Sequence, residues 1–206
     1  MYAHFDLGWV FLAHRRTGSV LTAEMLQRRG WVAVGRHHDA PWMMNSRLWT
    51  PPAVRFWASA PEQWAYVFAV RNHFDAILSG FCSADPLALD RGDRIDAAWL
   101  KGWFQQHPKA YPWRSRLWRF LWETDVLPGC SRQILRFESL RTDLDRFLGQ
   151  LGRTPTREEE WAVLRGRTPG KPTDGWQESY TDDGRQWVDR VFQKEKARLG
   201  YEFKTE

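Results

Sequence analysis

Two arginines and three small residues separate an apolar run from a helical pattern near the start of the chain. The stretch RRTGS (15–19) follows the apolar residues 9–13 and precedes an amphipathic segment, 20–29. A helix N-terminus presents backbone N–H groups and a partial positive charge, and small residues let the backbone approach an anion. Hydroxyls and cations add hydrogen bonds. The sequence therefore predicts a phosphate-binding loop made of Arg15, Arg16, Thr17, Gly18 and Ser19.

The same composition also fits a strand-to-helix turn with a Thr or Ser cap and two solvated arginines. The Walker A pattern G-x-x-x-x-G-K-[ST] cannot be fitted anywhere in the chain. Its absence argues against an ordinary ATP or GTP hydrolase.

A second candidate anion site lies where the apolar run 65–70 becomes the segment RNHFDAILSGF. Arg71 stands at the junction, and Ser79 follows eight residues later, two turns into the expected helix. Together they can hold one terminal phosphate, the arginine through a bidentate pair and the serine through its hydroxyl. The alternative is a salt-bridged arginine beside an incidental helical serine.

Two adjacent histidines, His37 and His38, follow a short apolar stretch at 31–35. Histidine is the side chain best suited to take a proton from a hydroxyl near neutral pH. Either residue is a candidate general base, and a pair of surface histidines is the alternative.

Apolar runs that alternate with helical patterns indicate how these residues are positioned. Strands are expected at 9–13, 31–35, 65–70 and 132–137, and helices at 20–29, 71–81, 93–106, 113–124, 139–151, 156–165 and 182–198. Such alternation predicts an α/β fold, a single domain over 1–206 with a central, mostly parallel sheet flanked by helices. The irregular connection 39–60 carries Trp42, Trp49 and Trp57, which either line an acceptor cleft or belong to a tryptophan-rich core.

The composition narrows the class of protein and of partner. The formal charge of +5 favours an anionic partner, and two cysteines are too few for a disulfide framework. No apolar run approaches membrane-spanning length, and the N-terminus lacks the charge order of a signal peptide. A cytoplasmic location is therefore expected.

Taken in order, these segments resemble the sulfotransferases that use 3′-phosphoadenosine-5′-phosphosulfate (PAPS). RRTGSVL is similar to their 5′-phosphosulfate loop, P-[KR]-[TS]-G-[TS]-[TS]-x-L, with Arg15 replacing proline and Val20 replacing a hydroxyl residue. VRNHFDAILS is similar to their 3′-phosphate motif, with Arg71 and Ser79 in register and His73 where proline is common.

Two further segments resemble the same family. GRHHDA is similar to the region that carries a catalytic histidine in the carbohydrate-acting branch. RGRTPGKPTDGWQESYT is similar to the loop that closes over the nucleotide in the cytosolic branch. This second match implies nucleotide-binding roles for Arg167, Lys171 and Trp176. A flexible basic surface loop is the alternative for it.

The resemblance implies a P-loop-like sulfotransferase fold and transfer of the sulfuryl group from PAPS to a hydroxyl, or to an amine, of an unidentified acceptor. The product would be adenosine 3′,5′-bisphosphate, and no metal is required. Arg16 would stabilise the developing negative charge, and His37 or His38 would deprotonate the acceptor, a small molecule, carbohydrate or peptide. Nucleic acid is not an expected partner.

Two other functions remain compatible with the residues. A nucleotide or small-molecule kinase would share the fold and the phosphate loop but needs a metal-binding carboxylate and a P-loop lysine. A non-catalytic, basic, tryptophan-rich module would bind nucleotide or glycan by stacking and charge.

Overall fold

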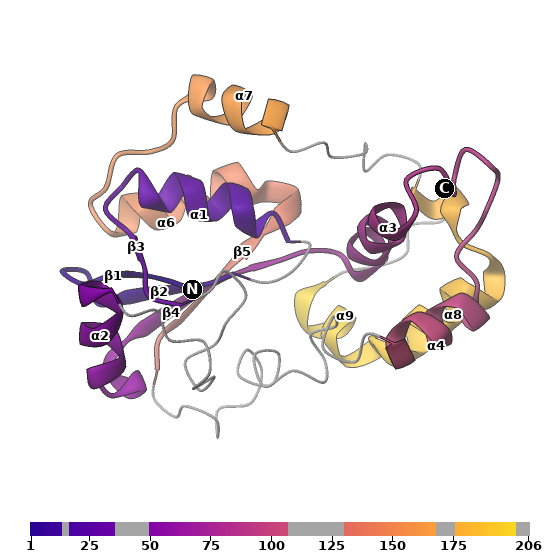
Figure 1. Ribbon diagram of the computed structural model, residues 1–206, viewed down its shortest axis with the longest axis horizontal. Coiled ribbons are helices and arrows are strands. Elements are labelled where there is room, and N and C mark those ends of the chain that lie inside the picture. The colour runs from indigo at the N-terminus through magenta and orange to yellow at the C-terminus, as the bar shows by residue number, and fades with distance from the viewer. Residues whose placement is uncertain (14–16, 36–49, 107–129, 168–175, 201–206) are drawn as a thin grey trace. The chain divides into compact units, whose positions relative to one another are not determined.

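A computed structural model describes residues 1–13, 17–35, 50–106, 130–167 and 176–200 (Figure 1). The chain forms two compact units. The first comprises Met1–Val70 and Tyr111–Thr168, and the second comprises Arg71–Ala110 and Pro169–Glu206. The expectation of one domain over 1–206 stays a prediction.

The first unit contains the whole of the described sheet. Its elements are β1 (Tyr2–His4), β2 (Trp9–Leu12), α1 (Ser19–Gln27), β3 (Val32–Ala33), α2 (Pro51–Ala58), the 3₁₀ helix η2 (Pro61–Gln63), β4 (Ala65–Val70), β5 (Arg132–Arg136), the 3₁₀ helix η4 (Phe137–Ser139), α6 (Leu140–Gln150) and α7 (Glu158–Arg167).

The five strands form one mixed sheet in the order β3-β1-β2-β4-β5. β2, β4 and β5 pair in parallel, with Leu12 opposite Phe68 and Val70 opposite Arg136. β1 is antiparallel to both β2 and β3, so β2 and β3 run in the same direction with β1 between them. The α/β class is confirmed, but the sheet is only partly parallel.

The difference from the expected sheet arises at the N-terminus. Residues 2–4 were not expected to form a strand, yet they fold back on β2 through a tight turn that ends at Gly8, where φ is 66°. This left-handed conformation favours glycine. The turn makes a hairpin with β2, and β3 then adds to the outer edge of β1 instead of pairing with β2.

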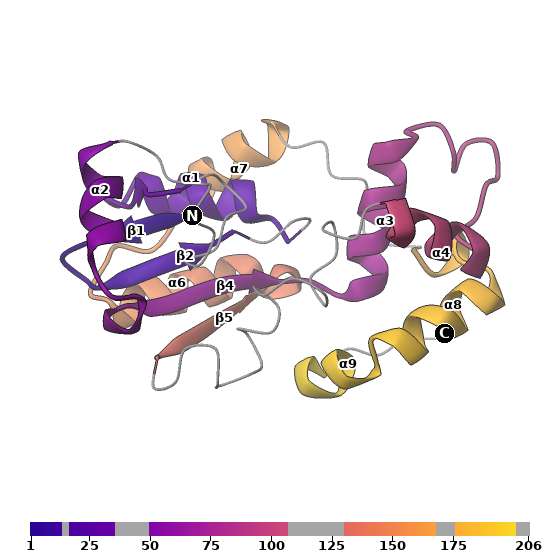
Figure 2. The ribbon, with the colours of Figure 1, turned by 60° about the horizontal axis from the view of Figure 1, so that its bottom comes forward.

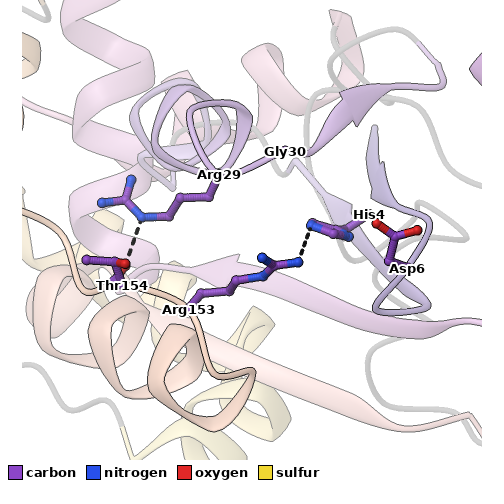
Figure 3. A pocket seen from close by; sticks show the side chains of 6 residues that line it. All are labelled: His4, Asp6, Arg29, Gly30, Arg153 and Thr154. Atoms are coloured by element: carbon purple, nitrogen blue, oxygen red, sulfur yellow. Dashed lines mark hydrogen bonds between the residues drawn. The ribbon is translucent and has the colours of Figure 1, made fainter.

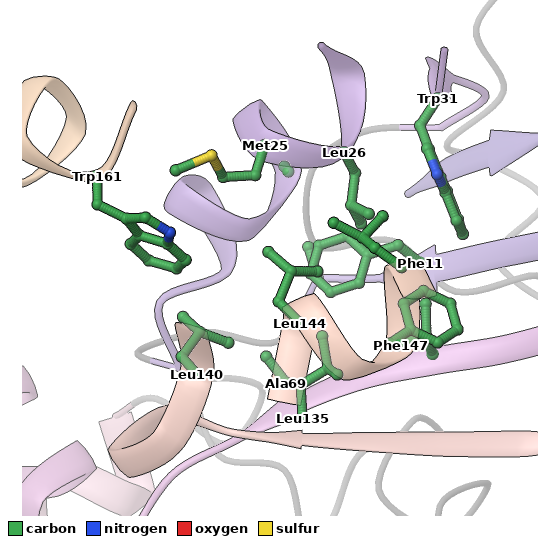
Figure 4. Close-up of a cluster of buried hydrophobic side chains, with 14 residues drawn as sticks. Phe11, Met25, Leu26, Trp31, Ala69, Leu135, Leu140, Leu144, Phe147 and Trp161 are labelled. Carbon is green, nitrogen blue, oxygen red and sulfur yellow. The ribbon is translucent and has the colours of Figure 1, made fainter. Parts of the chain in front are cut away.

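A single apolar cluster joins one face of the sheet to α1 and α6. Figure 4 shows Leu26 from α1 and Leu144 and Phe147 from α6 facing Phe11 of β2 and Leu135 of β5. Each of these side chains is almost completely buried, which stabilises the fold by about 1.5–3 kcal/mol per large apolar residue. The cluster therefore holds α1 and α6 against this face of the sheet.

The alternate residues of the central strands are buried as well. Val10, Leu12 and Phe68 point to the opposite face from the cluster and are fully buried. Burial on both faces accounts for the continuous apolar runs in β2 and β4, because an exposed face would require alternating polar residues.

The second unit is helical in its described part. It contains α3 (His73–Ala84), α4 (Ala97–Gln106), the 3₁₀ helix η5 (Trp176–Ser179), α8 (Asp182–Val191) and α9 (Gln193–Leu199), which Figure 2 shows grouped together. The expected helix over 182–198 is divided at Phe192, whose side chain is fully buried. The expected helix over 113–124 lies outside the described residues.

Candidate functional site

The predicted phosphate loop leads from β2 into α1. Gly18 occupies the N-cap position of α1 with φ 70° and ψ 19°, in the left-handed region. A Cβ atom at Gly18 would lie 2.8 Å from the ring of Phe137. Both the backbone conformation and the space therefore require glycine at this position.

The side chains of this turn are unequally exposed. Thr17 and Ser19 are each 4% exposed, whereas Val20 is 52% exposed. The Thr22 hydroxyl donates to the Gly18 carbonyl at 3.0 Å, inside the helix. In the described part of the loop, an approaching anion would therefore meet the backbone of the first turn and the side chain of Val20. The two hydroxyl residues, Thr17 and Ser19, are buried.

The second candidate site combines three residues at four-residue spacing. Arg71 is the first residue after β4, and its Nε donates to the Asp75 carboxylate in the first turn of α3. The side chains of Arg71 and Asp75 are 10% and 7% exposed. Ser79 lies one turn beyond Asp75 on the same face of the helix.

The start of α3 is fixed by a cap of its own. Asn72 is the N-cap residue, and its Oδ1 accepts a hydrogen bond from the Phe74 N–H at 3.0 Å. Asp75 adds negative charge to the first turn, where it stabilises the helix dipole. Asn72 therefore fixes the backbone at the start of α3, and Asp75 fixes the guanidinium of Arg71.

The segment after η5 is tied to the same helix. Tyr180 donates from its hydroxyl to the Phe74 carbonyl at 2.6 Å, and its ring meets the Phe74 ring edge-on. Tyr180 also forms a parallel bridge with Ile95, and the Thr181 hydroxyl caps α8 by accepting from the Gly184 N–H. These contacts give Tyr180 and Thr181 structural roles in the second unit.

Several predicted site residues are not placed by the structure. Those outside the described residues are Arg15, Arg16, His37, His38 and Lys171. Only the backbone is described for Arg167, at the end of α7, and for Trp176, at the start of η5. Their proposed contacts with the nucleotide stay predictions.

The sequence predicts that the tryptophans of the 39–60 connection either line an acceptor cleft or belong to the core. Trp42 and Trp49 lie outside the described residues. Trp57 lies on α2, donates from Nε1 to the Val34 carbonyl at 2.9 Å and meets the Phe56 ring edge-on. Trp57 thus anchors α2 to the chain after β3.

A cavity that the sequence did not predict lies in the first unit (Figure 3). Its volume is about 440 Å³, and its lining residues are His4, Asp6, Arg29, Gly30, Arg153 and Thr154. Arg153 donates from one terminal nitrogen to His4 Nε2 at 3.2 Å. These two residues are 149 positions apart, so no local pattern could have indicated their pairing.

Among residues 1–13, 17–35, 50–106, 130–167 and 176–200, no group of three or more His, Cys, Asp or Glu side chains is arranged to hold a metal ion. Within the same ranges, no helix has both the length and the apolar character to cross a bilayer.

Comparison with models of known protein families, with curated proteins and with solved structures finds no match to this chain.

Proposed function

We propose that this protein is a PAPS-dependent sulfotransferase on a P-loop-like α/β fold. The observation that carries the proposal is the left-handed Gly18 at the N-cap of α1, the helix that follows β2 in the chain, and β2 belongs to the parallel part of the sheet. Ligands of open α/β sheets bind outside the carboxyl ends of such strands, and a helix N-terminus there attracts phosphate. The proposal assigns the 5′-phosphosulfate to this turn.

The 3′-phosphate is assigned to Arg71 and Ser79. Arg71 is held by Asp75 at the start of α3, and Ser79 follows on the same helix face. A planar guanidinium whose orientation is fixed loses little entropy on binding a phosphate, and the serine hydroxyl adds a donor. This local arrangement supports the assignment, which otherwise rests on the resemblance of the segment to the 3′-phosphate motif.

The proposed reaction is an in-line displacement at sulfur. The acceptor hydroxyl transfers its proton to His37 or His38 while its oxygen forms a bond to sulfur. The bond between sulfur and the bridging oxygen of the 5′-phosphate breaks, and adenosine 3′,5′-bisphosphate leaves. Arg16 and the first-turn N–H groups stabilise the charge that develops on the bridging oxygen. Arginine keeps its proton, so Arg16 acts electrostatically.

The binding part of the proposal is tested by thermal unfolding without added metal. We expect adenosine 3′,5′-bisphosphate to raise the melting temperature of the wild-type protein more than ADP or ATP does. A ligand at about 100 times its Kd adds roughly 2.7 kcal/mol of stability. The shift should disappear in Arg71→Ala and persist in Arg94→Ala, a matched control at an exposed arginine of the same unit.

Equal stabilisation by ATP, or no stabilisation by the bisphosphate, would remove the nucleotide assignment. Turnover that requires ATP and magnesium would instead favour a kinase, and binding to oligonucleotides that weakens steeply with salt would favour the non-catalytic module. If the bisphosphate binds, transfer from PAPS to a panel of hydroxyl and amine acceptors tests the chemistry. In that assay Arg16→Ala should cost about 2.7–4 kcal/mol of transition-state stabilisation.

A further inference from the structure

The cavity lined by His4 and Arg153 lies at the opposite end of β2 from Gly18. His4 pairs with Trp9, the first residue of β2, whereas Gly18 follows the last. α1 connects the two ends, since it begins at Ser19 and is followed by Arg29 and Gly30 in the cavity wall. Nothing in the proposed sulfuryl transfer uses this cavity.

The two arginines of the lining differ in what they bind. The Arg29 guanidinium donates hydrogen bonds to the carbonyls of Met25, Thr154 and Pro155. It also forms an ion pair with Glu160 at 2.8 Å. Its charge and its donors are satisfied by the fold. Arg29 therefore holds the chain after α6 against the end of α1 and forms a wall of the cavity.

Arg153 has a different environment. Within the described ranges it forms no ion pair, its buried Nε has no hydrogen-bond partner, and its one side-chain hydrogen bond goes to His4. A guanidinium stays protonated at all physiological pH values, and a neutral imidazole cannot neutralise it. A partly buried cation without a counterion is unfavourable, and an anion bound beside it lowers that cost.

The position of Arg153 is fixed by His4 and Gly30. Because arginine only donates, His4 Nε2 must accept, so the ring is neutral with its proton on Nδ1. His4 is 5% exposed, and its ring meets the Trp31 ring edge-on. Gly30 has φ 89°, and a Cβ there would lie 3.2 Å from His4 Nε2, so the missing side chain leaves room for the bond.

We infer that this cavity binds a small oxyanion, a carboxylate or a phosphate, with Arg153 as the cation that holds it. Thr154 also lines the cavity. Figure 3 shows His4 between Arg153 and Asp6, so the Asp6 carboxylate limits the anion to the Arg153 side of the ring. The site is separate from the phosphate loop and does not depend on the proposed function.

The test is an NMR titration of the full chain with inorganic phosphate and, separately, with acetate, at constant ionic strength. The Gly30 amide and the His4 ring report on the cavity, and the Gly18 amide reports on the phosphate loop. We expect saturable shifts at Gly30 and His4. Saturation by phosphate alone identifies a phosphate ligand, and saturation by acetate identifies a carboxylate.

Three variants test the role of Arg153. Arg153→Gln should weaken binding about tenfold or more, the loss expected for a charged hydrogen bond. Arg157→Gln, at an exposed arginine of the same segment, should leave the dissociation constant unchanged. Asp6→Asn should strengthen binding, because it removes a negative charge from an exposed position beside the cavity.

The inference is wrong if neither anion shifts Gly30 and His4 in the wild-type protein, or if Arg153→Gln binds as well as the wild type. Shifts confined to Gly18 would also overturn it, while leaving the nucleotide proposal intact. The wild-type titration and Asp6→Asn keep the test decisive if Arg153→Gln does not fold.

Discussion

Arg71 donates through Nε to the Asp75 carboxylate one turn along the chain, and the side chains of both residues are at least 90% buried. The pair joins the residue that follows β4 to the first turn of α3. A carboxylate in this position fixes the guanidinium and also competes with any anion for it.

Asp75→Asn should destabilise the protein, because it removes the carboxylate that pairs with the buried guanidinium of Arg71. The expected loss in the free energy of unfolding is about 3 kcal/mol, the low end for breaking a buried ion pair. Urea unfolding measures it, with Asp85→Asn, in the exposed Arg91 pair, as a control that should show no measurable loss.

The same variant tests the 3′-phosphate assignment. If Arg71 binds the phosphate, adenosine 3′,5′-bisphosphate replaces the missing carboxylate, and its stabilisation should be larger in Asp75→Asn than in the wild type. Equal or smaller stabilisation would indicate that Arg71 serves only as the partner of Asp75.

Local patterns predicted the central elements of the fold well. Strand 65–70 was predicted with the observed bounds, and the helix expected over 139–151 spans Leu140–Gln150. Both depend on periodicity within a short window. The strand at 2–4 was missed because three residues carry no periodic pattern, and it forms only by pairing with β2 and β3.

Among the candidate site residues too, local spacing could be predicted from the sequence and long-range pairing could not. The common face of Asp75 and Ser79 can be read from the sequence, because helix geometry places residues four apart on one face. Arg71 precedes the N-cap of α3 and is joined to them by its ion pair with Asp75. The pairing of Arg153 with His4 depends on the sheet bringing the N-terminus beside the chain that follows α6. No sequence window contains that information.

Gly18→Ala should destabilise the first unit for two reasons. An alanine at φ 70° costs about 1–2 kcal/mol, and its Cβ would lie 2.8 Å from the Phe137 ring. Gly8→Ala is the matched control, since Gly8 has a similar φ of 66° but no atom within 4 Å of the added Cβ. Urea unfolding should give a distinctly larger loss for Gly18→Ala, and equal losses would show that the ring contact does not matter.

Gly184→Ala should disrupt the contact between α8 and Ile95, two residues before α4. The added Cβ would lie 2.2 Å from the Ile95 carbonyl oxygen, a backbone atom held by the bridge to Tyr180. Gly102→Ala, in an open position on α4, should instead stabilise the helix by about 1 kcal/mol. Opposite signs in thermal unfolding would support this packing, whereas a stabilising Gly184→Ala would contradict it.

The stability of the protein should fall in mildly acidic solution because of His4. Burial, and then the charge of Arg153, hold the pKa of His4 below its ordinary value of 6.5, despite the opposing effects of Asp6 and the Arg29 backbone. Above pH 6.5 the ring is neutral in both states. As the pH falls through 6.5, the unfolded chain binds a proton that the folded chain resists, so the free energy of unfolding decreases.

Urea unfolding between about pH 7.5 and about pH 5 measures this dependence. His4→Gln keeps a side-chain acceptor for Arg153 but does not titrate, so its unfolding free energy should vary less with pH in this window. A pH dependence identical to that of the wild type would show that His4 does not contribute.

Val20→Thr should strengthen binding of adenosine 3′,5′-bisphosphate if the first turn of α1 contacts the 5′-phosphate. Val20 is 52% exposed in that turn, so a hydroxyl there can reach an anion without displacing buried atoms. One added hydrogen bond to a charged group is expected to lower the dissociation constant about tenfold. Val163→Thr, at a valine 48% exposed on α7, is the matched control, and calorimetry measures both. Equal affinities would exclude the first turn from the nucleotide site and leave Arg71 to be tested by itself.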